Sequence, residues 1–453
     1  MAGRLGGWGR RLALLVGMKD NRASMLRRKM LFAGQLVALG AATLLGVAGA
    51  VVAAFAVYQL TLAVAALFYR WPRRDPEAAA AARARLVVVV PAHDEAALVG
   101  RCVRSLRTQT YPDDLYDVVV IADNCSDETA AGARAAGAEV VVRDVPDARG
   151  KGHALRWGID RVLGRAPAPD AVVVVDADSE ADPDFLELLV RPFERGAQAV
   201  QGESLLSPEG SRQAGFRATA FLLVNRVRPA GRAVLGGACN LAGNGMLFSR
   251  GLLLAHPWSA FTSAEDLEYS IHLQANGIRP AFAAGAILRS PAAPNSHAAA
   301  EQQLRWEGGK LHVAREQIPR LLSLAVRERR PSLLGTAFEL AVPPLGFLAA
   351  AAIIGTIFAA VAVAAGAASV WLLALWLLAL LSIPMYVLVG LVAAHAPASA
   401  YRSLALAPVF VLTKLSHIRR VYGFSAGSWV RTERAPQEAS PPGPLSPEPD
   451  PPA

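Results

Sequence analysis

"VVVVDADSEADPDFLELL" (residues 172–189) places a run of valines directly before a dense cluster of acidic side chains. A continuous run of β-branched residues is typical of a strand buried on both faces of a parallel sheet. Five carboxylates follow within nine residues, and like charges this close repel one another. The cluster therefore indicates a cation or a chemical task at the end of this strand. Its members are Asp176, Asp178, Glu180, Asp182 and Asp184.

An EF-hand calcium loop is one explanation of this spacing, because the acids recur at alternate positions. The context argues against it: a strand rather than a helix leads in, and Ala181 stands where the sharp turn of an EF-hand needs glycine. What remains is Asp176 and Asp178 at the carboxyl end of a strand, where open α/β sheets bind their ligands. We expect Asp182 or Asp184 to cap the helix that follows.

The preceding segments repeat the alternation of strand and helix. Strands built from β-branched runs alternate with amphipathic helices, which predicts an α/β fold whose mostly parallel sheet is covered on both faces. Each conspicuous acid comes just after a strand. The strand segments, with their turns, lie at 85–95, 116–127, 138–144 and 170–178, and the helices at 97–109, 128–137 and 152–164.

Long apolar segments flank this α/β region and predict a membrane protein. Hydrophobic residues make up 53 % of the 453 residues, and 31–69 contains no charged residue. As a helix that span measures about 58 Å, enough for at least one crossing, either as one long helix, which we favour, or as a hairpin. Segments 342–366 and 369–394 are each long enough to span, whereas 404–414 is too short and predicts an interfacial helix.

The net charge of +9 does not indicate nucleic-acid binding, because arginines gather beside the apolar segments, as at 26–29, 70–74 and 327–330. This pattern is typical of cytoplasmic flanks that face anionic lipid. The three cysteines form no CxxC, so their spacing indicates neither a zinc site nor a disulfide framework. We therefore expect a multi-pass protein of the cell membrane whose α/β domain faces the reducing cytoplasm.

Further polar motifs follow other predicted elements. Asp123 ends the second strand, where a buried carboxylate could bind a base or ribose, and Asp127 suits a helix cap. Lys151 in "RGKGHAL" begins a helix that resembles a phosphate cradle. The Gly-rich segment "GGACNLAGNGMLFSR" (236–250) has no repeat period, which indicates close approach of its backbone to another group.

Two more motifs lie on predicted helices. "AEDLE" places Glu265 and Asp266 at a helix start. "QQLRW" places Gln302, Arg305 and Trp306 at i, i+3 and i+4, which brings them to one side of a helix.

In order, "PAHDE", "ADNCSD", "RGKGHAL", "DADSEADPDF", "GNGM", "AEDLE" and "QQLRW" resemble the membrane-bound inverting family-2 glycosyltransferases. This group contains the cellulose, hyaluronan and poly-N-acetylglucosamine synthases. The resemblance covers about residues 86–310 and implies a GT-A-type nucleotide-sugar domain. Asp94 replaces the usual asparagine of the first motif, and Ala122 and Asn124 depart from the second, which leaves the nucleotide preference open.

The resemblance implies a role for each motif residue. Asp266 is the implied catalytic base, and Asp178 the ligand of a Mg²⁺ or Mn²⁺ ion. Glu265, Gln302, Arg305 and Trp306 would contact the diphosphate and the acceptor. The implied nucleotide-sugar contacts are Pro91, Ala92, Glu95, Asp123, Lys151 and Asp176.

The implied reaction transfers a sugar from a nucleotide sugar, expected to be a UDP-sugar, to a polysaccharide or a lipid-linked acceptor with inversion. A metal-dependent nucleotidyltransferase and a non-catalytic component of polysaccharide export are the alternatives. The donor sugar, the acceptor, processivity and an oligomer or export partner stay open. The expected order is a basic segment (1–30), a transmembrane anchor (31–69), a linker (70–85), the GT-A domain (86–312), interfacial helices (313–334), a transmembrane hairpin (335–395), an interfacial helix with a basic segment (396–434) and a disordered Pro-rich tail (435–453).

Overall fold

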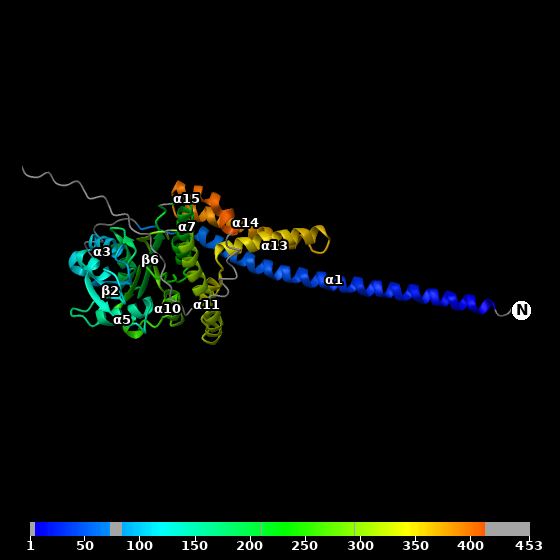
Figure 1. The fold of residues 1–453 in the computed structure, drawn as a ribbon, viewed down its shortest axis with the longest axis horizontal. Coiled ribbons are helices and arrows are strands. Elements are labelled where there is room, and N and C mark those ends of the chain that lie inside the picture. Colours follow the sequence, from blue (N-terminus) through cyan, green and yellow to red (C-terminus); the bar gives the residue numbers. More distant parts are fainter. Residues whose placement is uncertain (1–4, 73–83, 210, 294, 413–453) are drawn as a thin grey trace, which may run out of the picture. The chain divides into compact units, whose positions relative to one another are not determined.

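The computed structural model describes residues 5–72, 84–209, 211–293 and 295–412 (Figure 1). The chain divides into two compact units. One consists of Met1–Thr61 with Pro343–Leu388, and the other of Leu62–Val342 with Val389–Ala453. Most of the expected linker, the basic segment after residue 412 and the Pro-rich tail lie outside the described residues.

The second unit is built on an eight-stranded sheet with the order β3-β2-β1-β4-β7-β6-β8-β5. Four pairings are parallel and three, those of β7 with β4 and β6 and of β5 with β8, are antiparallel. The α/β class and the mostly parallel sheet are thus confirmed, whereas the valine pattern did not reveal the antiparallel β7. The strands are β1 Leu86–Ala92, β2 Tyr116–Asp123, β3 Glu139–Arg143, β4 Ala171–Val174, β5 Glu180–Ala181, β6 Ala199–Leu206, β7 Met246–Ser249 and β8 Ala281–Ser290.

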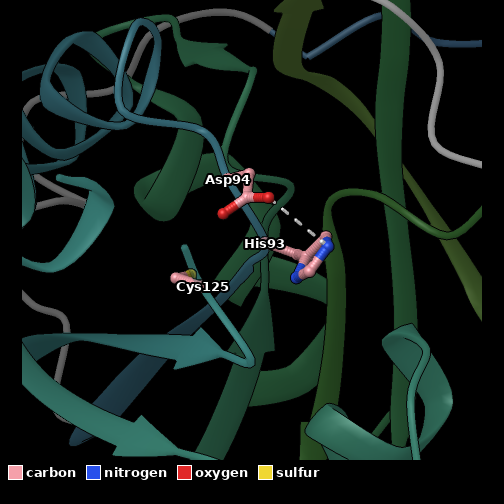
Figure 2. Close-up of side chains that lie close together, drawn as sticks. All are labelled: His93, Asp94 and Cys125. Carbon is pink, nitrogen blue, oxygen red and sulfur yellow. Dashed lines mark ion pairs between the residues drawn. The ribbon is translucent and has the colours of Figure 1, made fainter. Parts of the chain in front are cut away.

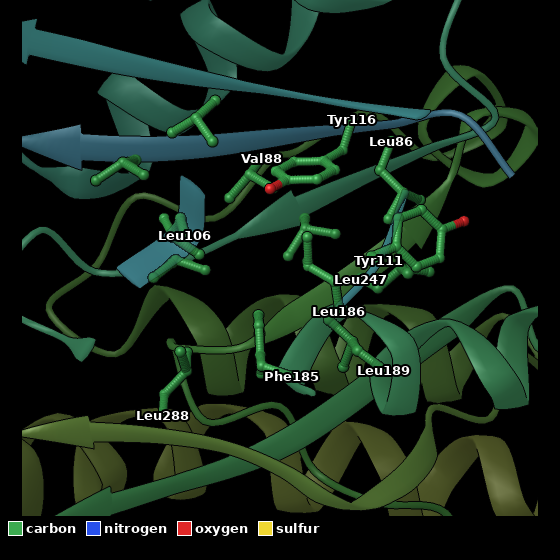
Figure 3. Packing of buried hydrophobic residues seen from close by; sticks show 14 of the residues in the cluster. Leu86, Val88, Leu106, Tyr111, Tyr116, Phe185, Leu186, Leu189, Leu247 and Leu288 are labelled. Atoms are coloured by element: carbon green, nitrogen blue, oxygen red, sulfur yellow. The ribbon is translucent and has the colours of Figure 1, made fainter. Parts of the chain in front are cut away.

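Helices cover both faces of this sheet because successive residues of a strand point to opposite faces. Val88 and Val90 of β1 join one buried cluster, which includes Phe185 and is drawn in Figure 3. Val87 and Val89 join the cluster on the other face. The helices of the unit are α3 Val99–Arg107, α4 Thr129–Ala135, α5 Lys151–Leu163, α6 Phe185–Glu194, α7 Arg212–Leu222, α8 Arg228–Val234, α9 Arg250–Ala255, α10 Glu265–Ala275, α11 Ser296–Arg327, α12 Ser332–Ala341 and α15 Ala398–Ser403, with short helical turns η1 Asp113–Leu115, η2 Leu223–Val227 and η3 Leu404–Leu406.

The strand order places the acidic motif at a topological switch point. β1 pairs in parallel with β2 on one side and with β4 on the other, so the chain reverses its direction of travel through the sheet between β1 and β4. Open α/β sheets bind ligands outside the carboxyl ends of the strands that flank such a point. The segments "PAHDE" and "DADSE" leave the sheet at this place.

The first unit contains helices long and apolar enough to cross a membrane. In the described part of the chain three candidate spans lie mainly in this unit, in α1 (Leu5–Ala66), α13 (Leu345–Ala364) and α14 (Val370–Ala393), with the span of α1 at Leu39–Ala66. Helix α1 also includes most of the expected basic segment, because basic residues do not interrupt a helix. Trp376 of α14 packs where glycines let the helices approach: a Cβ on Gly355 would lie 2.2 Å from its ring. The shorter apolar helix Ala398–Leu412 covers part of the expected interfacial segment.

Candidate active site

A lysine joins three of the sequence motifs at the edge of the sheet. Lys151 is the first residue of α5, and its Nζ lies 2.5 Å from Asp176 Oδ1 and 3.7 Å from Glu265 Oε1. The same ammonium donates a hydrogen bond of 2.5 Å to the carbonyl oxygen of Gly243. The structure therefore brings together the phosphate-cradle motif, the acidic strand end, the Gly-rich loop and the start of α10.

Gly243 is the point where the Gly-rich loop meets the carboxylates. Its φ is +77°, and a Cβ at this position would lie 3.1 Å from Asp266 Oδ2 and 3.5 Å from Lys151 Nζ. The sequence predicted close backbone approach in this loop, and the structure identifies Asp266 and Lys151 as the neighbouring groups. Gly243 is a site residue that the sequence reasoning did not name.

Asn244 holds the acidic strand end in place. Its Oδ1 accepts a hydrogen bond of 3.0 Å from the backbone N–H of Asp176, and its Nδ2 donates one of 2.8 Å to Ser179 Oγ. The Ser179 hydroxyl lies 3.2 Å from Asp178 Oδ1, to which it donates. The loop thus positions both aspartates of the motif, and the amide of "GNGM" is the signal that could have revealed this role.

Several carboxyl groups are buried close together in this site, and their pKa values differ from those of exposed carboxyl groups. Burial and the neighbouring Glu265 carboxylate raise the pKa of Asp266 to about 7. A hydrogen bond from the Leu267 N–H acts against this rise, because it stabilises the ionised carboxylate. Asp266 is the second residue of α10, whose N-cap is Ala264.

The pKa of Lys151 is raised as well, but by neighbouring charges rather than by burial. Burial lowers the pKa of Lys151, but the carboxylates Asp176 and Glu265 outweigh that effect and raise it above its ordinary value. Burial also raises the pKa of Asp176, against the lowering effect of Lys151. Lys151 is thus a permanent cation among acids whose charges it only partly offsets.

The other members of the acidic stretch have separate partners. Glu180 pairs with Arg101 at 3.5 Å and Asp182 with Arg289 at 3.0 Å, so the repulsion that the sequence implies is partly relieved by arginines from other elements. Asp184 occupies the expected N-cap position of α6, although its side chain makes no capping hydrogen bond there. Only Asp176 and Asp178 of this stretch remain associated with the candidate site.

The predicted nucleotide residues lie at the ends of β1 and β2. Pro91 and Ala92 end β1, and the backbone N–H of Glu95 donates to Thr129 Oγ1 at 2.7 Å. Asp123 is buried, with 5 % of its surface exposed, and its Oδ1 accepts from Arg143 and from Asn124 Nδ2. Arg143, which the sequence analysis missed, therefore fixes the carboxylate that was expected to bind the nucleoside.

The QxxRW motif lies on α11. Gln302 Oε1 accepts a hydrogen bond of 2.9 Å from Arg217, and the Trp306 ring, 36 % exposed, lies 5.3 Å from the ring of Phe221. These two side chains are therefore placed beside α7 rather than in the Lys151 cluster. One turn further along α11, a Cβ on Gly309 would lie 3.1 Å from the Cβ of Ala264, so the helix packs against the start of α10.

The donor set fits a hard divalent cation. Asp176, Glu265 and Asp266 act on Lys151, and Asp178 adds a further carboxylate beside Asp176. Mg²⁺ and Mn²⁺ favour oxygen ligands and complete their coordination with water or phosphate. The role of Asp178 as the ligand of such an ion stays a prediction.

The family model described as "Glycosyltransferase like family 2" matches residues 83–309, about half of the chain. The chain belongs to this family. The eight-stranded sheet of this family member has the GT-A-type α/β arrangement that the resemblance implied. The narrower resemblance to the cellulose and hyaluronan synthases stays a prediction.

Part of this chain is similar in sequence to two relatives of known name. It is 27 % identical over 239 residues to a beta-monoglucosyldiacylglycerol synthase of Synechocystis sp., a match that covers 50 % of this chain and 48 % of the relative. It is 33 % identical over 124 residues to the 4,4'-diaponeurosporenoate glycosyltransferase of Staphylococcus aureus, covering 26 % of this chain and 31 % of the relative. The chain thus spans half or less of the length of these relatives.

Two solved structures are similar in outline. The mannosyltransferase of Pyrobaculum calidifontis in complex with GDP-Man and Mn²⁺ is 16 % identical, with 82 % of this chain and 96 % of that chain covered and a TM-score of 0.44. The glucosyl-3-phosphoglycerate synthase of Mycobacterium tuberculosis, in complex with Mn²⁺, UDP and phosphoglyceric acid, is 25 % identical, with 52 % and 82 % covered and a TM-score of 0.37.

Proposed function

We propose that this protein transfers a sugar from a UDP-sugar to a lipid acceptor at a membrane, with inversion at the anomeric carbon. The observation that carries the proposal is the cluster in which Lys151 contacts Asp176 and Glu265 while Gly243 lies against Asp266. It unites a cation suited to a diphosphate with a carboxylate suited to take a proton.

Lys151 supports the donor end of the reaction. Its pKa is raised above the ordinary value although burial opposes this, so it stays charged and can move from Asp176 to an incoming diphosphate. A divalent ion bound at Asp178 would supply further positive charge to the departing diphosphate. Lys151 and the N-terminus of α5 act on the same negative group, because a helix N-terminus favours anions.

Asp266 supports the acceptor end. As the base it takes the proton of the acceptor hydroxyl while that oxygen attacks the anomeric carbon, and the bond to the diphosphate breaks with its electron pair on the leaving group. A pKa of about 7 suits this task, since a general base is most effective when its pKa lies near the working pH. A single displacement inverts the configuration, so an α-linked donor gives a β-linked product.

A lipid acceptor is supported by three features. The named relatives include a beta-monoglucosyldiacylglycerol synthase and a diaponeurosporenoate glycosyltransferase. Among the described residues, three helices are long and apolar enough to span a membrane, which is consistent with an acceptor held in a lipid bilayer. Trp306 and Phe221 add an aromatic pair beside α7, which suits contact with an acceptor that has an apolar part.

The deciding experiment is a donor and acceptor panel with the purified full chain. UDP-glucose, UDP-galactose and UDP-N-acetylglucosamine are each incubated with Mg²⁺ or Mn²⁺ and either diacylglycerol in mixed micelles or a free oligosaccharide. We expect release of UDP and a glycolipid of the corresponding mass. Release of pyrophosphate would indicate nucleotidyl transfer, and extension of the oligosaccharide would replace the lipid acceptor by a polysaccharide.

The same proposal places the catalytic domain in the cytoplasm, where nucleotide sugars are made. The basic flanks of the apolar segments support this orientation. A reporter fused at Thr432, which lies outside the described residues, should be active on the cytoplasmic side. A reporter active only outside the cell would contradict it.

A further inference from the structure

A second cluster of side chains lies at the ends of β1 and β2 and includes a thiol. His93 Nε2 or Nδ1, a carboxylate oxygen of Asp94 and Cys125 Sγ all lie within 4.8 Å of one another (Figure 2). β1 and β2 run in parallel with Ala92 opposite Ala122, so the turns that follow them are neighbours. The spacing of the cysteines along the sequence indicated no zinc site, because this arrangement forms only between two turns.

The histidine ring is fixed in one orientation. His93 Nδ1 lies 2.7 Å from the carbonyl oxygen of Asp123, which can only accept a hydrogen bond, so Nδ1 carries a proton. In the neutral ring Nε2 then carries the lone pair. A backbone carbonyl that binds one ring nitrogen is the usual support for a histidine whose other nitrogen binds a metal.

The carboxylate is also held in place. Asp94 has a φ of +53°, in the left-handed region that is uncommon for residues other than glycine. Its Oδ1 accepts from the Ser126 backbone N–H at 2.6 Å, and its Oδ2 lies 3.7 Å from His93 Nε2. This nitrogen and this carboxylate oxygen are therefore close enough to bind the same cation.

We propose that His93, Asp94 and Cys125 form a binding site for a Zn²⁺-class ion, separate from the Mg²⁺ or Mn²⁺ expected at Asp178. Imidazole nitrogen and thiolate sulfur favour zinc and cobalt over magnesium. Three protein ligands leave a fourth position for water. Coordination forms the metal–sulfur bond and passes the thiol proton to solvent.

The ion would compete with the donor nucleoside. Pro91, Ala92, Glu95 and Asp123, which the proposed function assigns to nucleotide binding, lie within two residues of the three ligands along the chain. An ion and a nucleoside at the same strand ends exclude one another. We expect Zn²⁺ to raise KM for the UDP-sugar without lowering kcat at saturating donor. This consequence rests on the proposed function, whereas the ion site does not.

The test uses Co²⁺ as an optical probe of the full chain in detergent, with excess Mg²⁺ to fill the site at Asp178. Bound cobalt should give a thiolate-to-metal charge-transfer band in the near ultraviolet. The band should disappear in Cys125→Ser and persist in Cys239→Ser, a buried cysteine elsewhere in the fold. Asp94→Asn, which tolerates the left-handed backbone, should weaken binding by about tenfold or more.

The outcome of this experiment distinguishes a failure of the ion site from a failure of the proposed transferase function. A missing band in the wild type, or a band that survives in Cys125→Ser, overturns the ion site whatever the transferase activity is. Thermal midpoints measured without metal show whether each variant is folded, and Asp94→Asn decides the matter if Cys125→Ser is not. Binding of Co²⁺ with no effect of Zn²⁺ on KM overturns only the competition.

Discussion

Lys151 Nζ lies 2.5 Å from Asp176 Oδ1 and 3.7 Å from Glu265 Oε1, so one ammonium connects the acidic end of β4 with the start of α10. These residues are distant in sequence and belong to three different motifs. Their contact means that a change in charge at the donor end alters the ionisation of Asp266 at the acceptor end, because Lys151 lowers the Asp266 pKa against burial and Glu265.

The variant Lys151→Gln tests this electrostatic effect of Lys151 on the pKa of Asp266. Without the ammonium the pKa of Asp266 rises above about 7, so the rising limb of the kcat/KM profile moves to higher pH. We also expect kcat/KM for the UDP-sugar to fall by about 10² or more, since a charge on the leaving diphosphate is lost. Lys151→Arg serves as the matched variant, and an unshifted profile in Lys151→Gln would show that the two groups are not connected.

Asp266→Asn should lower turnover by about 10² or more with donor affinity nearly unchanged, because the amide keeps the size of the side chain and cannot take a proton. The wild type should gain kcat/KM as pH rises through about 7, and the variant should lose this dependence. The control is Glu268→Gln on the same helix, whose carboxylate accepts from Thr262 Oγ1 at 3.0 Å. Near wild-type turnover in Asp266→Asn would remove this residue from the mechanism.

The same ionisation has a consequence for stability. A carboxyl whose pKa is higher in the folded than in the unfolded state stabilises the fold fully below its unfolded value and loses that contribution as pH rises through the folded value. Asp266, raised from 3.8 to about 7, should therefore make the free energy of unfolding fall between about pH 4 and pH 7. Denaturant titrations should show a weaker fall in Asp266→Asn, and parallel curves would contradict the raised pKa.

Asp178→Asn should abolish transfer while the fold remains intact, since the removal of one carboxylate from an acidic cluster lowers repulsion. EDTA should have the same effect on the wild type, and Mn²⁺ titration should show weakened binding in the variant. Glu180→Gln is the control, because Glu180 is exposed and pairs with Arg101 at 3.5 Å. Activity that survives in EDTA would show that the reaction needs no metal.

The variant Gly243→Ala tests the role of Gly243, which the sequence did not identify as a site residue. Gly243 and Gly236 have φ values of +77° and +72°, so alanine adds a similar backbone strain, about 1 kcal/mol, at either place. A Cβ on Gly243 lies 3.1 Å from Asp266 Oδ2, whereas a Cβ on Gly236 meets nothing within 4 Å. We expect Gly243→Ala to lose activity by about tenfold or more and Gly236→Ala to retain it, and equal losses would assign the effect to strain.

The sequence by itself determined the local elements and the order of the motifs. The valines of β1 and β4 specified buried parallel strands, because β-branched runs suit a surface covered on both faces. The apolar segments specified three candidate spans, because length and hydropathy are local properties. Asp176 and Asp178 could be assigned to the end of a strand because they directly follow the valine run in the sequence.

Only the tertiary structure decided which distant groups meet and how they ionise. Arg143 pairs with Asp123, Arg101 and Arg289 neutralise acids that the sequence placed in one repelling cluster, and Gly243 rather than a side chain lies against Asp266. Hydropathy and spacing cannot report these contacts, since they depend on the strand order and on the antiparallel β7. The pKa of Asp266 follows from them, because burial and neighbouring charge are properties of the folded site and not of the residue.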